Sequence, residues 1–284
     1  MKIGKKEFAW GQKTYVMGII NMTPDSFSGD GLGQDLDTAV KLALGMQEQG
    51  ADIIDVGGES TRPAGKVYGK GAEPVSAEKE LRRVLPLIAR LSKTLEIPIS
   101  IDTYKVEVAR KAVQAGASLI NDVWGLKRDP KLAEVASETG VPLSLMHNQE
   151  GYEYEDLMTD IIGSVRKSMK QARAAGVPAE NIIIDPGIGF GKNVEHNLEI
   201  LRRLDEFKKA LGQPLMIGAS RKSFIGTVLG GLPPQDRLEG TAATLALAIV
   251  KGADIVRVHD VKQMVRVCRM ADAIVYERFS KNLH

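Results

Sequence analysis

The sequence predicts an α/β fold, a (β/α)₈ TIM barrel formed by one domain that spans residues 1–284. Three observations support this prediction. Short apolar strands alternate with helical segments along the whole chain, one strand motif recurs at regular distances, and the length suits the fold. The chain has 284 residues, of which 43% are hydrophobic, and TIM barrels typically have about 250 residues around one large core.

A short motif recurs three times and sets the spacing of the strands. It reads Gly-Ala-Asp-Ile-Ile-Asp-Val from Gly50, Gly-Ala-Ser-Leu-Ile-Asn-Asp from Gly116 and Gly-Ala-Asp-Ile-Val-Arg-Val from Gly252. Each glycine follows a helical stretch and precedes an apolar strand. The first two glycines are 66 residues apart and the last two 136 apart. These distances equal about two and four βα units of roughly 33 residues, so further strands must lie between the motifs.

The elements follow one another in a regular order. Residues 1–14 come first and are expected to form a short hairpin across the bottom of the barrel. The strands are expected within residues 16–20, 50–56, 97–101, 116–122, 143–146, 182–185, 215–218 and 252–258, and many are near-continuous apolar runs, as in a parallel sheet that helices cover. The expected helices are 38–49, 76–95, 104–115, 130–139, 156–175, 195–211, 238–251 and 261–278. Eight strands and eight helices favour a closed barrel, with an open doubly wound sheet as the alternative.

The composition excludes several classes of function. The net charge is +2, from 38 basic and 36 acidic residues, which gives no general field for nucleic acid or an anionic membrane. Cys268 is the single cysteine, so no intrachain disulfide or cysteine-based zinc cluster can form, and a reduced, cytoplasmic setting is expected. The first residues contain no apolar run typical of a signal peptide, and no stretch reaches 18 apolar residues, so we expect no transmembrane helix.

Polar residues stand where the predicted strands end, which is where TIM barrels place their active sites. An acid after a strand often caps the next helix, and Asp260, Asp129, Ser76 and Asp102 are candidates for that role. However, Asp55, Asp102, Asp122 and Asp185 should all converge on one barrel mouth. Crowded buried carboxylates repel each other and are costly to desolvate, so they predict a polar ligand rich in N–H donors. The amide of Asn121 has both a donor and an acceptor, which suits the edge of a heterocycle.

Three features predict an anion subsite. The segment 218–223, Gly-Ala-Ser-Arg-Lys-Ser, is expected to lead from a strand into a short helix, and phosphates bind free N–H groups at such positions. Arg257 and His259 alternate along the last strand and should therefore point to the same face. Arg62 could match phosphate oxygens with its planar guanidinium, although a surface salt bridge is the alternative for this residue.

Other residues near the strand ends are less specific. His147 is more readily explained as a packed, hydrogen-bonded residue than as a ligand. Met146 could belong to the core or pack on a flat ring. Gly187, Gly189 and Gly191 do not have the spacing of a dinucleotide-binding motif, and they predict a tight loop that a ligand can approach.

Together these motifs resemble the dihydropteroate synthase family. The segments that carry the resemblance are MGIINMTPDSFSGDG (17–31), DVGGESTRPAG (55–65), SIDTYK (100–105), INDVWG (120–125), LMHN (145–148), IIIDPGIGFGK (182–192), IGASRKSFIG (217–226) and RVHDV (257–261). They occur in the family's order and cover essentially the whole chain. LMHN departs slightly from the family's LMHM and puts no catalytic role in doubt.

The resemblance implies a step of folate biosynthesis, in an enzyme family targeted by sulfonamides. A 7,8-dihydropterin with a hydroxymethyl diphosphate loses diphosphate, and the amine of p-aminobenzoate takes its place. The resemblance also implies Mg²⁺, bound with diphosphate by Asn21, loops 21–33 and 57–74 that close over the site, and a homodimer formed through barrel helices.

The resemblance implies a role for each matching residue, with Asp102, Lys222, Arg257 and His259 as the catalytic set. Hydrogen bonds to the pterin ring are implied for Asp102, Asn121 and Asp185, and a pterin contact for Lys222. Met146, Phe190 and Gly218 would line the pterin pocket. Diphosphate would be held by Thr61, Arg62, Ser220, Arg257 and His259. Phe27 and Pro63 would lie beside p-aminobenzoate, and Ser223 near its carboxylate.

The implied chemistry agrees with the residues. Departure of diphosphate leaves positive charge on the pterin methylene, which a carboxylate, most simply Asp102, can stabilise. No covalent nucleophile is needed, and no Ser/His/Asp or Cys/His set is evident. Alternatives are a pterin-dependent methyltransferase barrel, a Schiff-base aldolase that uses Lys222, and a non-catalytic pterin-binding paralogue.

Overall fold

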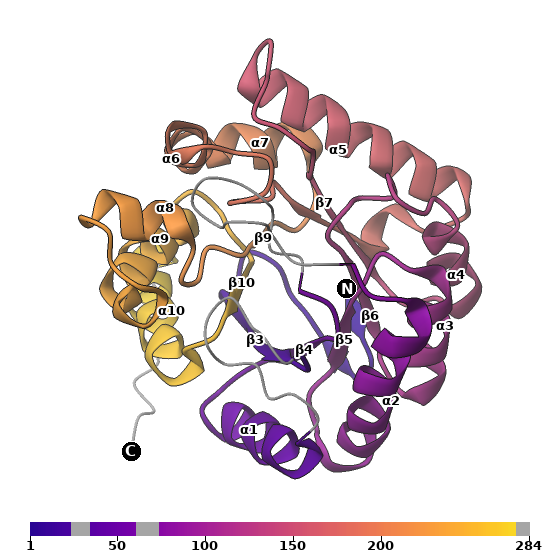
Figure 1. Cartoon of the computed structure of the whole chain (residues 1–284). Helices are drawn as coiled ribbons and strands as arrows, with labels where there is room; N and C mark the ends of the chain where they lie inside the picture. The colour runs from indigo at the N-terminus through magenta and orange to yellow at the C-terminus, as the bar shows by residue number, and fades with distance from the viewer. Residues whose placement is uncertain (24–34, 61–73, 277–284) are drawn as a thin grey trace.

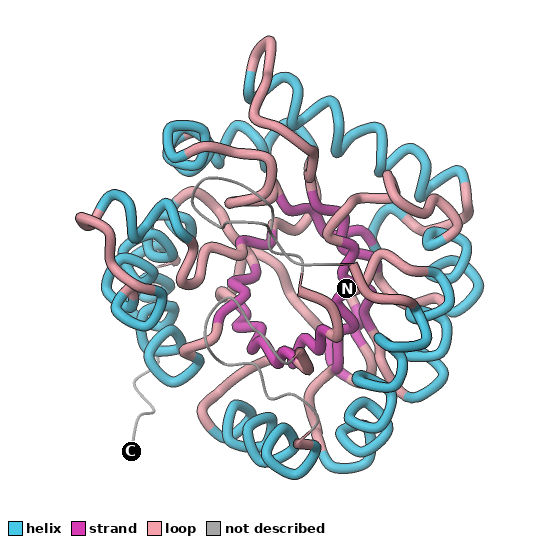
Figure 2. The backbone as a smooth tube through the Cα atoms, in the orientation of Figure 1, coloured by secondary structure: helices cyan, strands magenta, loops and turns pink. Residues whose placement is uncertain are grey.

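In the computed structural model, which describes residues 1–23, 35–60 and 74–276, eight parallel strands form a barrel inside a ring of helices (Figures 1 and 2). The strands are β3 (Tyr15–Asn21), β4 (Ile53–Gly57), β5 (Ile99–Asp102), β6 (Leu119–Asp122), β7 (Leu143–Met146), β8 (Ile182–Asp185), β9 (Met216–Ile217) and β10 (Ile255–Val258). Neighbours along the chain are neighbours in the sheet, and β10 pairs with β3. The barrel closes where Ile184 bridges to Leu215 and donates its N–H to the Pro214 oxygen at 2.9 Å. The predicted TIM barrel is confirmed.

Helices cover the outside of the barrel. Within the described ranges they are α1 (Leu36–Glu48), α2 (Ala77–Thr94), α3 (Val106–Ala115), α4 (Leu132–Thr139), α5 (Leu157–Ala174), α6 (Val194–Arg202), α7 (Leu204–Leu211), α8 (Ser223–Val228), α9 (Leu238–Val250) and α10 (Val261–Val275). Short 3₁₀ turns lie at Ala179–Asn181 and Pro234–Asp236. None of the described helices is long and apolar enough to cross a membrane.

The expected N-terminal hairpin is present and closes the bottom of the barrel. Strands β1 (Lys2–Ile3) and β2 (Lys6–Glu7) pair in antiparallel fashion. Ile3 and Phe8 are buried in one cluster with Met17 and Ile53 from the inner faces of the barrel strands. The hairpin therefore caps the N-terminal end of the barrel, which leaves the opposite end as the place for a site.

The two faces of each strand have different surroundings because side chains alternate along a strand. In β4, Ile54 and Val56 point outward into the core between barrel and helices. Ile53 points inward, and Asp55, two residues later, does so too. Apolar side chains thus fill the lower interior of the barrel and polar ones its upper interior.

The predicted helix caps are partly confirmed. Ser76 caps α2, because its Oγ accepts the Lys79 N–H at 3.2 Å. Asp129 accepts the Lys131 N–H at 3.2 Å in the turn before α4, whose N-cap residue is Lys131. The two acids that follow strands directly do not cap: Asp260 precedes α10 but binds Arg221 at 2.6 Å, and Asp102 binds Arg257. These predictions are wrong because a nearby guanidinium offers each carboxylate a charged donor, a stronger hydrogen bond than a backbone N–H provides.

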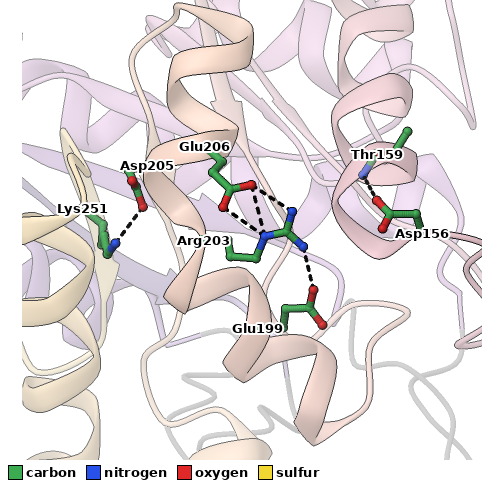
Figure 3. A network of polar contacts seen from close by, with 7 residues as sticks. All are labelled: Asp156, Thr159, Glu199, Arg203, Asp205, Glu206 and Lys251. Carbon is green, nitrogen blue, oxygen red and sulfur yellow. Dashed lines mark hydrogen bonds and ion pairs between the residues drawn. The ribbon is translucent and has the colours of Figure 1, made fainter.

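The single helix expected over 195–211 is two helices, α6 and α7, separated at Arg203. The chain turns there with φ −108° and ψ 22°, and the Arg203 side chain binds Glu199 on one side and Glu206 on the other (Figure 3). Buried Ile200 and Leu204 keep a helical spacing across the turn, which explains why the sequence pattern does not reveal the break.

Candidate active site

Two carboxylates and one guanidinium meet inside the C-terminal end of the barrel. Asp55 of β4 and Asp102 of β5 are buried, with 0% and 8% of their surface exposed. Arg257 of β10 donates from Nε to Asp55 Oδ2 at 2.6 Å and from Nη2 to Asp102 Oδ2 at 2.7 Å. One planar guanidinium therefore holds together two carboxylates that would otherwise repel each other in a poorly solvated place.

Asn121 of β6 lies beside this group, in register with Asp102. Its Nδ2 donates to Asp55 Oδ2 at 3.2 Å, which orients the amide. Asp55 Oδ1, Asp102 Oδ1 and Asn121 Oδ1 are buried and have no hydrogen-bond partner within the described part of the chain. Each buried acceptor without a partner costs about 1–3 kcal/mol. The arrangement therefore suits a ligand that brings several N–H donors.

Burial and the surrounding charges change the pKa of Asp102. Burial raises the pKa of Asp102 to about 7, although the Arg257 guanidinium acts in the opposite direction. Glu80 of α2 is also buried and adds negative charge nearby, and it shares Lys105 with Glu59. The sequence analysis did not find this second acidic group, because no recognisable spacing links its members.

Asp185 lies at the end of β8, paired with Met146 of β7. Its Oδ1 accepts the Gly187 N–H at 2.7 Å. Burial raises the pKa of Asp185 to about 6, and the Gly187 N–H opposes that change. Asp185 is therefore a third inward-facing carboxylate whose charge depends on pH near neutrality.

Asp122 does not join the other carboxylates, and the prediction that all four converge is wrong. Its Oδ1 accepts from Trp124 N at 2.9 Å and its Oδ2 from Leu126 N at 2.6 Å. Leu126 has a φ of 63°, a conformation that costs energy in a residue with a side chain. Because Asp122 follows inward-facing Asn121, it points out of the barrel and stabilises this turn.

Lys222 and Phe190 form one wall of the site. Lys222 Nζ lies 3.9 Å from the centroid of the Phe190 ring, in a cation–π arrangement. Burial and Arg257 lower the pKa of Lys222 to about 7, whereas Asp185 and Asp102 raise it. A Cβ added to Gly189 would lie 3.0 Å from the Lys222 side chain, so the glycine allows this close approach. A Cβ added to Gly218 would lie at an ordinary contact distance, 3.9 Å, from Arg257.

The segment after β9 forms the predicted short helix α8 and the residues of the expected anion subsite. His259 donates its backbone N–H to Ser220 Oγ at 3.2 Å, and its Nδ1 lies 3.0 Å from the same oxygen. Arg221 has a φ of 57°, and such backbone strain is common in functional loops. Ser223 begins α8 directly after Lys222. Ser220 and His259 thus lie together, while Arg257, predicted to point the same way as His259, lies among the carboxylates.

Asn21 lies at the end of β3, half-buried next to Gly57. Among the residues that the structure describes, no group of three or more His, Cys, Asp and Glu side chains could hold a metal ion. Mg²⁺ often binds through one or two protein oxygens and completes its shell with water and substrate phosphates. The amide oxygen of Asn21 fits that kind of site and does not fit a metal cage made of protein ligands alone.

Lys192 is a buried residue that the sequence analysis missed. Its Nζ donates to the Phe190 oxygen at 2.8 Å and lies 2.9 Å from His147 Nδ1. The interpretation of His147 as a packed, hydrogen-bonded residue is therefore favoured. A lysine at the end of a glycine loop resembles an exposed loop residue in sequence, so no local signal marks its burial.

Four of the residues expected in the site, Phe27, Thr61, Arg62 and Pro63, lie outside the described residues. The remaining expected residues come from the ends of the eight strands and from the loops that follow them. The structure therefore brings together three of the four expected carboxylates, the amide of Asn121 and the cations of Lys222 and Arg257 at one end of the barrel.

Comparison with known proteins identifies relatives over nearly the whole chain. Residues 17–259 match the family of pterin binding enzymes. The dihydropteroate synthase of Clostridium beijerinckii is 52% identical over 276 residues, which cover 97% of this chain and 99% of that protein.

Solved structures agree with this result. The dihydropteroate synthase of Clostridium difficile, crystallised in the presence of pteroic acid, is 49% identical and superposes with a TM-score of 0.87 over 94% of this chain and 99% of that one. The Xanthomonas albilineans dihydropteroate synthase with 4-aminobenzoic acid is 40% identical, with a TM-score of 0.84 over 92% and 93% of the two chains.

Proposed function

The chain belongs to the dihydropteroate synthase family of pterin-binding enzymes, which are transferases of folate biosynthesis, and on that premise we propose its reaction. It condenses (7,8-dihydropterin-6-yl)methyl diphosphate with p-aminobenzoate to give 7,8-dihydropteroate and diphosphate. Of the two relatives, one was crystallised in the presence of pteroic acid, the oxidised form of the proposed product, and the other with 4-aminobenzoic acid, the proposed second substrate.

The three buried acceptors without partners are the observation that carries this proposal. Asp55 Oδ1, Asp102 Oδ1 and Asn121 Oδ1 lie close together in the mouth. A dihydropterin presents an amino group and ring N–H groups along its edges, so it can satisfy several of these oxygens at once. An aliphatic acid presents carboxylate oxygens, which accept hydrogen bonds and do not donate them, so it matches the pattern less well.

Side chains that can pack on the flat faces of the pterin also line the pocket. Met146 is buried at the end of β7, and Phe190 carries Lys222 against its ring. Aromatic and thioether groups pack well on a heterocycle. The hydroxyl of Ser220 and the imidazole of His259, which lie together after β9 and β10, offer a subsite for the diphosphate.

The reaction needs charge stabilisation and no covalent intermediate. The bond between methylene carbon and oxygen breaks, with its electron pair on the leaving diphosphate. The amine nitrogen then forms a bond to the same carbon and releases a proton. Asp102 stabilises the positive charge on the methylene, while Ser220 and His259 hold the leaving group. Loss of water from this buried site strengthens each of these interactions.

A magnesium ion fits the proposed leaving group and one residue of this chain. When bound, Mg²⁺ would neutralise charge on diphosphate. The Asn21 oxygen would be its protein ligand, and phosphate and water oxygens would complete the shell.

We also propose a homodimer. Helices α9 and α10 pack against each other and leave Leu247, Val250, Met270 and Ile274 exposed, with 59–67% of each residue's surface accessible. Large apolar side chains grouped on adjacent helices favour association with another copy of the chain. Light scattering after size exclusion should give twice the monomer mass of 30.8 kDa, and Leu247→Glu should shift the protein to monomer.

The test of the proposed reaction is diphosphate release from the dihydropterin diphosphate, measured with and without p-aminobenzoate and with Mg²⁺ or a chelator. Release should accelerate with p-aminobenzoate and fall strongly in chelator. Release that is independent of p-aminobenzoate, or no release at all, would refute the proposal.

A further inference from the structure

Lys192 connects two parts of the site without belonging to its surface. The residue is 5% exposed. Its Nζ donates to the Phe190 carbonyl oxygen at 2.8 Å and contacts His147 Nδ1 at 2.9 Å. His147 directly follows β7, and Phe190 lies in the loop after β8. The lysine therefore ties the end of one strand to the loop after the next.

The Phe190 loop is also held at its other residues, so the role of Lys192 is local. Gly189 N donates to Asn197 Oδ1 at 2.6 Å, and Tyr154 Oη donates to the Gly191 oxygen at 2.7 Å. A Cβ on Gly187 would lie 1.8 Å from the His147 oxygen, so the loop start already packs against β7. These contacts fix the loop backbone on both sides of Phe190. The hydrogen bond to the Phe190 carbonyl oxygen itself comes from Lys192.

The protonation states of this group allow both contacts. Burial, with Lys192 and Lys127 nearby, lowers the pKa of His147 to about 2, so the imidazole is neutral and can accept at Nδ1. Burial also lowers the pKa of Lys192, with Asp185 opposing and Lys127 and Lys222 adding to the effect. Both the ammonium and the amine form have at least two N–H groups, so the two contacts persist in either state.

We propose that Lys192 is a positioning residue that holds the Phe190 ring under Lys222 and so sets one wall of the pterin pocket. The chain of contacts runs from His147 to Lys192 Nζ, to the Phe190 carbonyl and, through the Phe190 ring, to Lys222 Nζ at 3.9 Å from its centroid. The assignment of this wall to pterin rests on the proposed function, whereas the positioning of Phe190 does not.

The first test reads the position of Phe190 without any ligand. The chain has six phenylalanines, so 4-fluorophenylalanine gives six ¹⁹F resonances, and Phe190→Leu identifies that of Phe190. Lys192→Met should shift or broaden the Phe190 resonance and leave that of Phe207, in the barrel core, unchanged. Lys127→Met is the matched control, because it removes the same kind of bond, from Lys127 Nζ to the Asn148 carbonyl oxygen at 2.6 Å. It should leave the Phe190 resonance unchanged. An unchanged Phe190 resonance in Lys192→Met would overturn the inference.

The second test uses binding and kinetics. Lys192→Met should weaken binding of the dihydropterin diphosphate about tenfold and raise the KM for this substrate by the same factor. The KM for p-aminobenzoate should stay unchanged. In a Phe190→Ala background the same substitution should lower the affinity for the dihydropterin diphosphate less than about twofold. The reason is that the effects of two substitutions do not add when one residue acts through the other. An equal loss in both backgrounds would refute a role through Phe190. If wild type does not bind the dihydropterin diphosphate, the proposed function fails, and the ¹⁹F result still decides the positioning role.

A variant that keeps a donor guards against loss of the fold. Lys192→Gln retains an amide N–H that can reach a carbonyl, and it should restore part of the affinity lost in Lys192→Met. If Lys192→Met does not fold, the ¹⁹F spectrum and the binding measurement are made on Lys192→Gln instead. The change in the Phe190 resonance and in affinity should then be smaller. A purely structural role would lower the melting temperature in both variants without a selective change in pterin affinity.

Discussion

Replacement of Arg257 by methionine should destabilise the protein in a pH-dependent way. Arg257 donates to Asp55 at 2.6 Å and to Asp102 at 2.7 Å, and both carboxylates are buried. Removing one partner of a buried ion pair typically costs about 3–5 kcal/mol, because it leaves an uncompensated charge. For a chain of this size we expect the melting temperature to fall by roughly 10 °C near pH 8.

The sign of the pH dependence follows from Asp102. Its pKa in the folded protein is already raised from 3.8 to about 7, and loss of Arg257 removes a group that opposes this rise. The folded state then binds the proton more tightly than the unfolded state, so stability falls as pH rises. The deficit of Arg257→Met should therefore be largest above pH 8 and shrink toward pH 5, where Asp102 becomes protonated.

Thermal unfolding between pH 5 and pH 9, followed by circular dichroism, measures this difference. The matched control is Arg82→Met, because Arg82 pairs with Glu78 on the surface of α2 with 62% and 79% of the two side chains exposed. Exposed pairs contribute at most about 1 kcal/mol. A deficit that is equal in the two variants, or that grows toward acid, would refute the assignment of Arg257 as the group that holds the carboxylates.

Three further predictions concern ligands. Lys222→Ala and Asp185→Asn should each reduce binding of the dihydropterin diphosphate at least 100-fold by calorimetry, because each removes a contact in a buried pocket, and unchanged affinity would contradict the site. p-Aminobenzoate should bind only after the pterin or diphosphate, so a titration of the bare protein should show no heat, and tight binding there would contradict the order. Affinity for the pterin should fall as pH falls through about 6, where Asp185 becomes protonated and loses an acceptor, and Asp185→Asn should leave only the dependence near pH 7 that Asp102 causes.

The fold was predictable because its signals are local and repeated. The Gly-Ala motif recurs at βα spacing, and each apolar strand is short and bounded by turn residues. The turn at Arg203 was not predictable, since Ile200 and Leu204 keep helical spacing on both sides of it. The capping role expected of Asp260 failed because its partner, Arg221, lies 39 residues away in the sequence.

The sequence predicts which residues form the site better than it predicts the directions and contacts of their side chains. The position of Asp102, Asn121 and Asp185 at strand ends follows from the barrel rule and from alternation along the strand. The outward direction of Asp122 also follows from alternation, but a carboxylate next to Asn121 looks equivalent when only strand ends are counted. The buried pair of Lys192 and His147 depends on packing between two loops, and no pattern within either segment encodes it.

The central claim is that buried acceptors in the barrel mouth select a ligand by its N–H donors. The most direct measurement compares the affinities of 6-hydroxymethyl-7,8-dihydropterin diphosphate and its analogue without the 2-amino group, by calorimetry on the same protein. Loss of the donor should leave a buried oxygen without a partner, at a cost of about 1–3 kcal/mol, and so weaken binding about 5- to 150-fold. Equal affinity for the two compounds would contradict the account.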